Sequence, residues 1–207
     1  AMLPFFMMFE GRKPKAREIM VISVLAAIGV AGRAAFFMVP SFKPVAAIVI
    51  LTGISFGGEA GFLVGSLTML ISNMFMGQGP WTPWQMFAFG MIGFLAGILY
   101  QKGILKARKF DLCIYGFLSG FLYGWIMNLY YIIGWVRPFS LKAAGAAYIS
   151  SFFFDLSHGI CTALVLWLVG ETWVRKLLRI KKKFGLTGEI RRYELPPSFR
   201  AMEGDIP

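Results

Sequence analysis

Asp155 and His158 are a pair of residues in this sequence whose types could carry out acid–base chemistry. Their spacing of three places both side chains on one face of a helix. Such a pair could act as a general acid and base, or it could be a hydrogen-bonded pair that ties helices together. His158 is the only histidine, which excludes a zinc site built from several imidazoles. A site of Asp155, His158 and one further ligand stays conceivable, but we predict no metal site.

A loop without a single charge runs from Gly77 to Gln85 and reads GQGPWTPWQ. Its glycines and prolines fix the backbone, while Trp81, Trp84 and the two glutamines provide flat apolar surface and neutral hydrogen-bonding groups. A rigid, aromatic and uncharged loop is suited to covering a small molecule. The alternative interpretation is that Trp81 and Trp84 anchor the loop at a membrane interface.

Further polar residues are expected near one end of the apolar segments. Asn73 ends the third segment and Gln85 begins the fourth. Asn128 and Tyr131 lie in the outer half of the fifth. Arg33 lies near the far end of the first segment, where its long side chain can extend to the interface or line a cavity. Because polar groups are costly in lipid, these residues and the acid–base pair predict one outward-facing pocket.

The elements that must position these residues are apolar helices. The chain has 207 residues, of which 57% are hydrophobic and 15% charged, a balance far more apolar than that of a soluble domain. We therefore predict an all-α integral membrane protein. The net charge of +11 would suggest nucleic acid in a soluble protein. Here Lys and Arg gather beside apolar segments, as the positive-inside rule describes, so we expect no nucleic-acid partner.

Six transmembrane helices are predicted, with three strongly basic regions all on one side of the membrane. These regions precede the first segment, separate the fourth from the fifth and follow the sixth, so both termini are expected to be cytoplasmic. Residues 1–17 form an apolar segment with a basic collar, 18–174 the membrane domain and 175–207 a basic cytoplasmic tail. The expected spans are about 18–39, 45–56, 60–75, 85–100, 112–135 and 146–174.

No common catalytic motif is present in the sequence. It lacks the GxxxxGK[ST] phosphate loop, HExxH and GxSxG, so we predict that the chain is not an enzyme and does not itself hydrolyse ATP by the common route. The first apolar segment carries small residues at four-residue spacing, which let another helix approach closely. That helix could belong to the same chain or to a partner. The residues are Ser23, Ala27, Ala31 and Ala35.

The stretch KPVAAIVILTGISFGGEAGFLVGSLTMLISNMFMGQGPWTPWQM and the first-span segment AAIGVAGRAA resemble the substrate-binding S component of an energy-coupling factor (ECF) vitamin transporter. The resemblance covers about residues 17–174. Within the superfamily, the chain most resembles the group associated with cobalamin and related corrinoids. It implies a multi-pass protein of the prokaryotic plasma membrane that binds a vitamin from outside. It also implies a transmembrane coupling subunit and two cytoplasmic ATPases as partners, with ATP used by those partners, no cofactor of the chain's own, and delivery by toppling in the bilayer.

The resemblance also implies roles for individual residues. The family's alanine-xxx-alanine contact with the coupling subunit corresponds to Ala27 and Ala31, and Ser23 and Ala35 extend that face. Ligand binding is implied for the outer loops and the outer halves of the later spans. In this sequence the implied ligand-binding residues are Arg33, Lys43, Asn73, Gln78, Gly79, Trp81, Trp84, Gln85, Asn128, Tyr131, Trp135, Asp155 and His158.

Several ligands and two other classes of protein stay open at this point. A neutral loop rich in Trp and Gln suits a flat ligand that carries amides, as cobalamin does. An anionic vitamin such as pantothenate or folate would favour an arginine fork, which Arg33 or Arg137 could supply. Riboflavin and a queuosine precursor are further alternatives. The other classes are an intramembrane enzyme that uses Asp155 and His158, and a partner-free channel or structural subunit.

Overall fold

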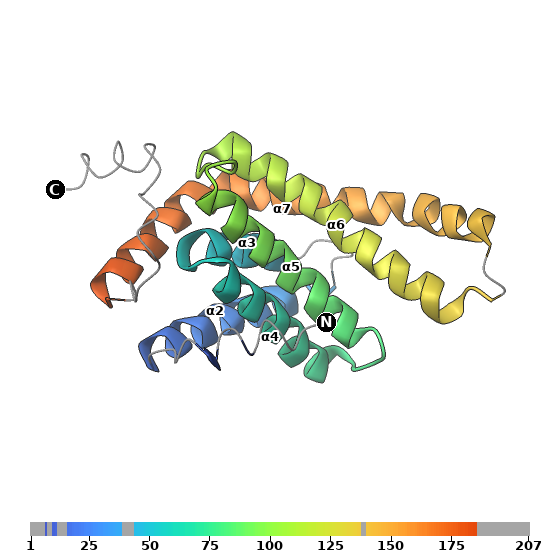
Figure 1. Ribbon diagram of the computed structural model, residues 1–207, viewed down its shortest axis with the longest axis horizontal. Helices are drawn as coiled ribbons and strands as arrows, with labels where there is room; N and C mark the ends of the chain where they lie inside the picture. The colour runs from blue at the N-terminus through green and yellow to red at the C-terminus, as the bar shows by residue number, and fades with distance from the viewer. Residues whose placement is uncertain (1–6, 8–9, 12–15, 39–43, 138–139, 186–207) are drawn as a thin grey trace.

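A computed structural model describes residues 7, 10–11, 16–38, 44–137 and 140–185. These residues form helices and no strand, as the all-α prediction requires. Each of the six predicted apolar segments corresponds to one helix (Figure 1). The helices are α2 (Ala16–Ala35), α3 (Val45–Phe56), α4 (Gly58–Met76), α5 (Thr82–Gln101), α6 (Lys109–Trp135) and α7 (Leu141–Lys183).

Five of these helices, α2 and α4 to α7, are long and apolar enough to cross a membrane. Helix α3 has 12 residues and is about 18 Å long, against about 30 Å of hydrocarbon in a bilayer. The chain is thus a multi-pass membrane protein by the length and composition of its helices. The sixth crossing and the cytoplasmic termini stay predictions.

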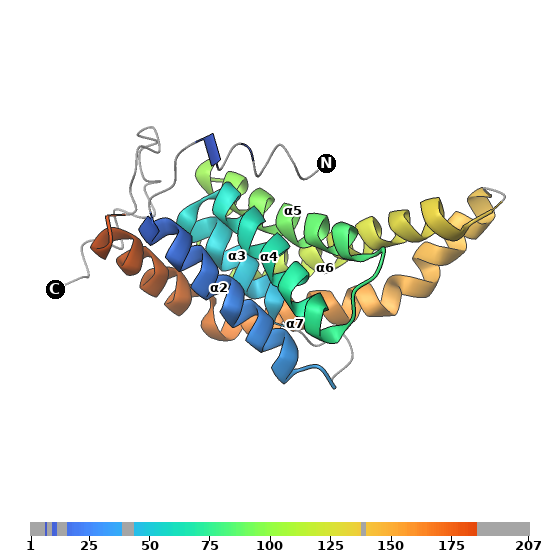
Figure 2. The same cartoon turned by 90° about the horizontal axis from the view of Figure 1, so that it is seen from below.

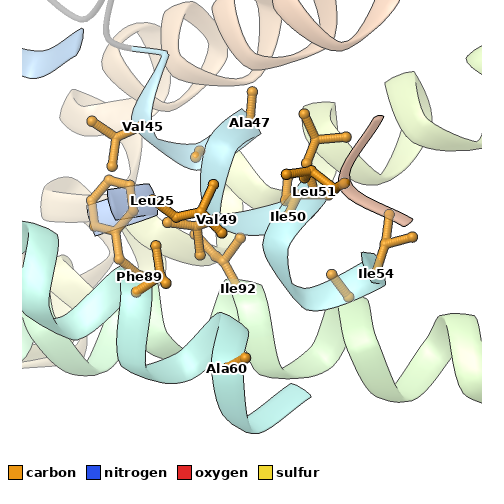
Figure 3. Close-up of a cluster of buried hydrophobic side chains, with 14 of the residues drawn as sticks. Leu25, Val45, Ala47, Val49, Ile50, Leu51, Ile54, Ala60, Phe89 and Ile92 are labelled. Atoms are coloured by element: carbon orange, nitrogen blue, oxygen red, sulfur yellow. The ribbon is translucent and has the colours of Figure 1, made fainter. Parts of the chain in front are cut away.

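Helix α3 lies at the centre of the bundle and contacts every other helix, from α2 to α7. All of its residues except Phe56 are buried, which is expected for a helix that is apolar on every face. Its Val45, Val49 and Ile50 pack in a cluster with residues such as Leu25 of α2 and Ile92 of α5 (Figure 3). The short second segment is therefore a buried core helix.

Glycines allow α3, α4 and α5 to pack with their backbones in contact. A Cβ atom on Gly53 or Gly61 would overlap the backbone of Gly93, and one on Gly93 would overlap the carbonyl of Gly61. The turn between α3 and α4 is a single residue, Gly57, with φ of 103°, a conformation that side chains other than glycine rarely adopt. Tight packing of these three helices is thus encoded by residues that lack side chains.

Helices α6 and α7 form an antiparallel hairpin that projects beyond the ends of α2 to α5 (Figures 1 and 2). The sequence predicts a sixth segment of 146–174, but α7 has 43 residues and is about 65 Å long. It continues past residue 174, so the predicted boundary between membrane domain and tail is not a helix end. Exposed apolar side chains such as Trp125, Phe153 and Leu168 cover the hairpin, as expected for surfaces that face lipid.

Candidate substrate-binding site

Arg33, in the last turn of α2, turns toward α4 and is half-buried. Its Nη1 atom donates hydrogen bonds to Ser72 Oγ at 2.5 Å and to Asn73 Oδ1 at 2.6 Å, and lies 3.6 Å from Met69 Sδ. Ser72 is itself fixed by donating to the Met69 carbonyl. The guanidinium is therefore held against the end of α4 through one of its three nitrogens.

Asn73 connects Arg33 to the next helices through a directed series of hydrogen bonds. Only 1% of Asn73 is exposed, and its Nδ2 donates to Thr82 Oγ1 at 3.0 Å and to Gln85 Oε1 at 2.8 Å. Gln85 Nε2 then donates to the Tyr123 hydroxyl of α6 at 3.2 Å. We call Arg33, Ser72, Asn73, Thr82, Gln85 and Tyr123 the polar layer. It crosses the bundle from α2 through α4 and α5 to α6.

Aromatic rings pack around Tyr123 within this layer. The ring of His158, from α7, lies 5.3 Å from the ring of Tyr123, and that of Phe89 lies 4.9 Å from it. His158 thereby brings the long hairpin into contact with the polar layer.

Asp155 belongs to a second polar cluster, formed between α6 and α7. Asn128 Nδ2 donates to Ser151 Oγ at 2.7 Å, and Ser151 Oγ donates to Asp155 Oδ2 at 3.2 Å. Asp155 is 5% exposed, and its carboxyl group lies against Gly124, where a Cβ atom would overlap it. These contacts favour the structural interpretation of Asp155, in which it ties two helices together.

The uncharged loop joins α4 to α5, and backbone hydrogen bonds hold both of its ends. The Gly77 amide donates to the Asn73 carbonyl at 2.8 Å, and Gly77 itself has a φ of 114°. The Thr82 amide donates to the Gly79 carbonyl at 2.9 Å. The indole of Trp81 packs directly on Gly79, so a Cβ atom on that glycine would overlap the ring. Short-range bonds thus fix the backbone on both sides of the loop.

The predicted loop of residues 77–85 ends earlier than expected, because α5 begins at Thr82, and its two tryptophans differ in their surroundings. Trp84 packs against Tyr130 of α6 with 5.8 Å between ring centroids. Trp81 is 39% exposed and Gln78 is also exposed. Trp84 thus packs on a ring of another helix, and Trp81 is the more exposed of the two tryptophans.

The predicted ligand-binding residues fall into distinct groups. The structure brings Arg33, Asn73, Gln85 and His158 together at the polar layer, and Asn128 and Asp155 together in the second cluster. It does not bring the end of α6 to the layer. Tyr131 and Trp135 are 51% and 66% exposed and lie about 12 and 18 Å along the helix beyond Tyr123. Lys43 lies outside the described residues, and Gln78, Gly79, Trp81 and Trp84 lie in or beside the loop.

Sequence reasoning missed four residues that complete these networks. Ser72 and Thr82 flank predicted positions, and Ser151 lies one helical turn before Asp155, so proximity in sequence could have indicated them. Tyr123 stands among many aromatics in the fifth segment, and no local pattern distinguishes it. Among the described residues, no three His, Cys, Asp or Glu side chains gather closely enough to hold a metal ion.

The small-residue face of α2 points away from the described bundle. Ser23, Ala27, Ala31 and Ala35 are all exposed, whereas the opposite face buries Ile22, Leu25, Ala26 and Gly29. Neighbouring Val24 and Ile28 are exposed as well, at 53% and 38%. Within the described chain, therefore, no helix covers the face that the sequence predicted to be a packing surface.

A membrane helical bundle with a buried polar layer near one end is suited to binding a polar small molecule. A scan of protein families identifies the class further. The chain belongs to the family described as ECF transporter, substrate-specific component, whose family model matches residues 17–170. Members of this family bind substrate for a transporter and are not enzymes, so the enzyme alternative of the sequence analysis is wrong.

The chain is also similar to curated proteins named UPF0397. It is 30% identical over 122 residues to one from Vibrio atlanticus, covering 53% of this chain and 66% of the relative. It is 29% identical over 103 residues to one from Aliivibrio fischeri, covering 46% and 56%, and 29% identical over 105 residues to one from Aliivibrio salmonicida, covering 48% and 55%. The chain thus spans less than two thirds of the length of these relatives. No solved structure gives a significant match.

Proposed function

We propose that this chain is the S component of an ECF-type importer in a prokaryotic plasma membrane, where it captures a vitamin or a related compound from outside. The observation that carries this proposal is the family match over residues 17–170. The polar layer supports it, because a membrane bundle keeps buried polar groups mainly where they pair or meet a polar ligand.

The orientation follows from charge in this proposal. With α3 as a sixth crossing, the basic regions before α2, after α5 and at the end of α7 share the cytoplasmic side. Arg33 at the end of α2 and Gln85 at the beginning of α5 then lie toward the outside. The polar layer then lies toward the extracellular end of the bundle.

The proposed partners are a transmembrane coupling subunit and two cytoplasmic ATPases that supply the energy of ATP. The uncovered small-residue face of α2 is the contact for the coupling subunit, since small side chains allow a second helix to approach closely in lipid. Toppling of the bundle against that subunit delivers the ligand inward. The chain contributes no ATP hydrolysis of its own.

Cobalamin or a related corrinoid is the ligand that the neutral loop favours. Gln78, Trp81 and Trp84 offer amide groups and aromatic surface to a flat ligand decorated with amides. Folate, pantothenate, riboflavin and a queuosine precursor are the alternatives. Each of these would have to bind at the polar layer beneath the same loop.

The coupling proposal is tested by assembly of the complex. The full chain is co-expressed with an ECF coupling subunit and its two ATPases, and co-purification is compared between the wild type and the double variant Ala27→Leu, Ala31→Leu. Ala143→Leu with Ala146→Leu, on exposed positions of α7, is the matched control. We expect the α2 variant to lose the complex and the α7 variant to keep it. Failure of the wild type to assemble, or equal assembly of both variants, would contradict the proposal.

A further inference from the structure

The anchoring of Arg33 leaves one edge of its guanidinium open. All three contacts, to Met69, Ser72 and Asn73, are made by Nη1. Among the described residues, no atom accepts a hydrogen bond from Nε or Nη2. Those two nitrogens lie side by side on one edge of the planar group and form the fork that binds a carboxylate or phosphate through two parallel hydrogen bonds.

Arg33 also lacks a counter-ion in the part of the chain that the structure describes. Its anchoring atoms are the neutral groups of Ser72 and Asn73. The carboxylate of Asp155 accepts from Ser151 in the second cluster. Glu59 lies at the opposite end of α4, about 21 Å of helix away from Asn73. Because a half-buried charge without a partner is costly in a low-dielectric bundle, this arrangement favours an anion supplied from outside the chain.

The polar layer fixes the orientation of this guanidinium. Asn73 accepts from Arg33 because its own Nδ2 is committed to Thr82 and Gln85, and Gln85 is held in turn by Tyr123. Each amide therefore has one orientation that satisfies the network. A structural strut between α2 and α4 would need only a neutral donor, so the positive charge is unexplained by the anchoring contacts alone.

We propose that the substrate carries an anionic group, a carboxylate or a phosphate, that binds the Nε and Nη2 edge of Arg33. This inference rests on the proposed function and narrows it. Pantothenate and folate meet the requirement through carboxylates, and cobalamin meets it through the phosphodiester of its nucleotide tail. Riboflavin, which is neutral, does not.

The test is calorimetric titration of the detergent-purified full chain with pantothenate, folate, cobalamin and riboflavin. Two comparators that lack the anionic group separate the two sources of charge: panthenol replaces the carboxylate of pantothenate by an alcohol, and cobinamide lacks the nucleotide tail of cobalamin together with its phosphodiester. We expect an anionic vitamin to bind tightest and its comparator to bind roughly 10- to 100-fold more weakly, the range of a hydrogen bond to a charged group.

Variants of Arg33 give the second readout. Arg33→Gln should weaken the tightest ligand by a similar factor and remove the preference over its comparator, whereas Arg33→Lys should retain part of that preference. Arg17→Gln, at the other end of α2 and exposed, is the control and should bind as the wild type does. If Arg33→Gln fails to fold, Arg33→Lys and the comparators on the wild type decide the question.

The outcomes separate the two proposals. Tightest binding of riboflavin, equal binding of a vitamin and its comparator, or undiminished affinity of Arg33→Gln would overturn the anionic substrate while the S-component function stands. Binding of none of the probes to a folded protein would count against both. Loss of complex assembly with the coupling subunit would count against the function alone.

Discussion

Replacing Asn73 with alanine tests whether the polar layer is an integrated network. Asn73 is almost fully buried and makes three hydrogen bonds, one from Arg33 and one each to Thr82 and Gln85. Alanine removes all three, and it leaves the guanidinium attached to α4 through Ser72 and a weak contact with the Met69 sulfur. The substitution thus removes contacts among three helices, α2, α4 and α5, through a single side chain.

The expected loss of stability can be worked from these contacts. Hydrogen bonds between helices in membranes contribute about 0.6 kcal/mol on average and up to about 1.7 kcal/mol, so the two neutral bonds give about 1–3 kcal/mol. The bond from Arg33 adds about 1.5–3 kcal/mol because its donor is charged. Asn73→Ala should therefore lower the free energy of unfolding by about 3–6 kcal/mol, a large part of the stability of an ordinary domain.

The assay is reversible unfolding in mixed micelles, followed by helical circular dichroism. Gln85→Ala should lose about 1–3 kcal/mol, because it removes the bonds to Asn73 and Tyr123. The exposed Gln78 supplies the matched control, and Gln78→Ala should change stability by less than about 0.5 kcal/mol. A double-mutant cycle of Asn73 and Gln85 should give a coupling energy of about 0.6–1.7 kcal/mol, the contribution of the bond they share.

Two results would refute this reasoning. Additive effects of Asn73→Ala and Gln85→Ala would mean that the two amides do not interact. Equal losses from Gln78→Ala and Gln85→Ala would mean that the hydrogen bonds of Gln85 in the polar layer do not contribute to stability.

Two further substitutions test the packing that supports the site. Gly93→Leu should reduce the yield of folded protein or cost at least about 1–3 kcal/mol by overpacking, whereas Gly134→Leu, where nothing lies near an added Cβ atom, should fold normally in size-exclusion chromatography. Lys181 Nζ donates to the Ser55 carbonyl at the end of α3 at 3.0 Å; Lys181→Met should lower stability by about 1–2 kcal/mol, with exposed Lys183→Met as the control. Equal thermal unfolding of the two lysine variants would show that this contact does not stabilise the helix end.

The sequence by itself determined the class of the protein and the six helices that the structure describes between residues 16 and 183. Apolar segments separated by basic or glycine-containing turns predicted each of the six helices, because hydropathy and turn chemistry are local properties. The resemblance of about residues 17–174 to S components predicted the family that the family model over residues 17–170 confirms. The pattern of apolar segments also indicated Arg33, Asn73 and Gln85, since polar residues at the ends of such segments are conspicuous in any sequence.

Only the tertiary structure decided which predicted site residues belong to the polar layer, which to the second cluster and which to neither. The hairpin of α6 and α7 is longer than the other helices, so Tyr131 and Trp135 lie beyond the layer although the sequence placed them with it. Helix α3 ends at Gly57 after 12 residues and is enclosed by the five other helices, and hydropathy alone does not indicate this central position. The link from Asn73 through Gln85 to Tyr123 joins residues 38 apart at its longer step. Such contacts depend on how helices pack around glycines, which no local pattern of residues specifies.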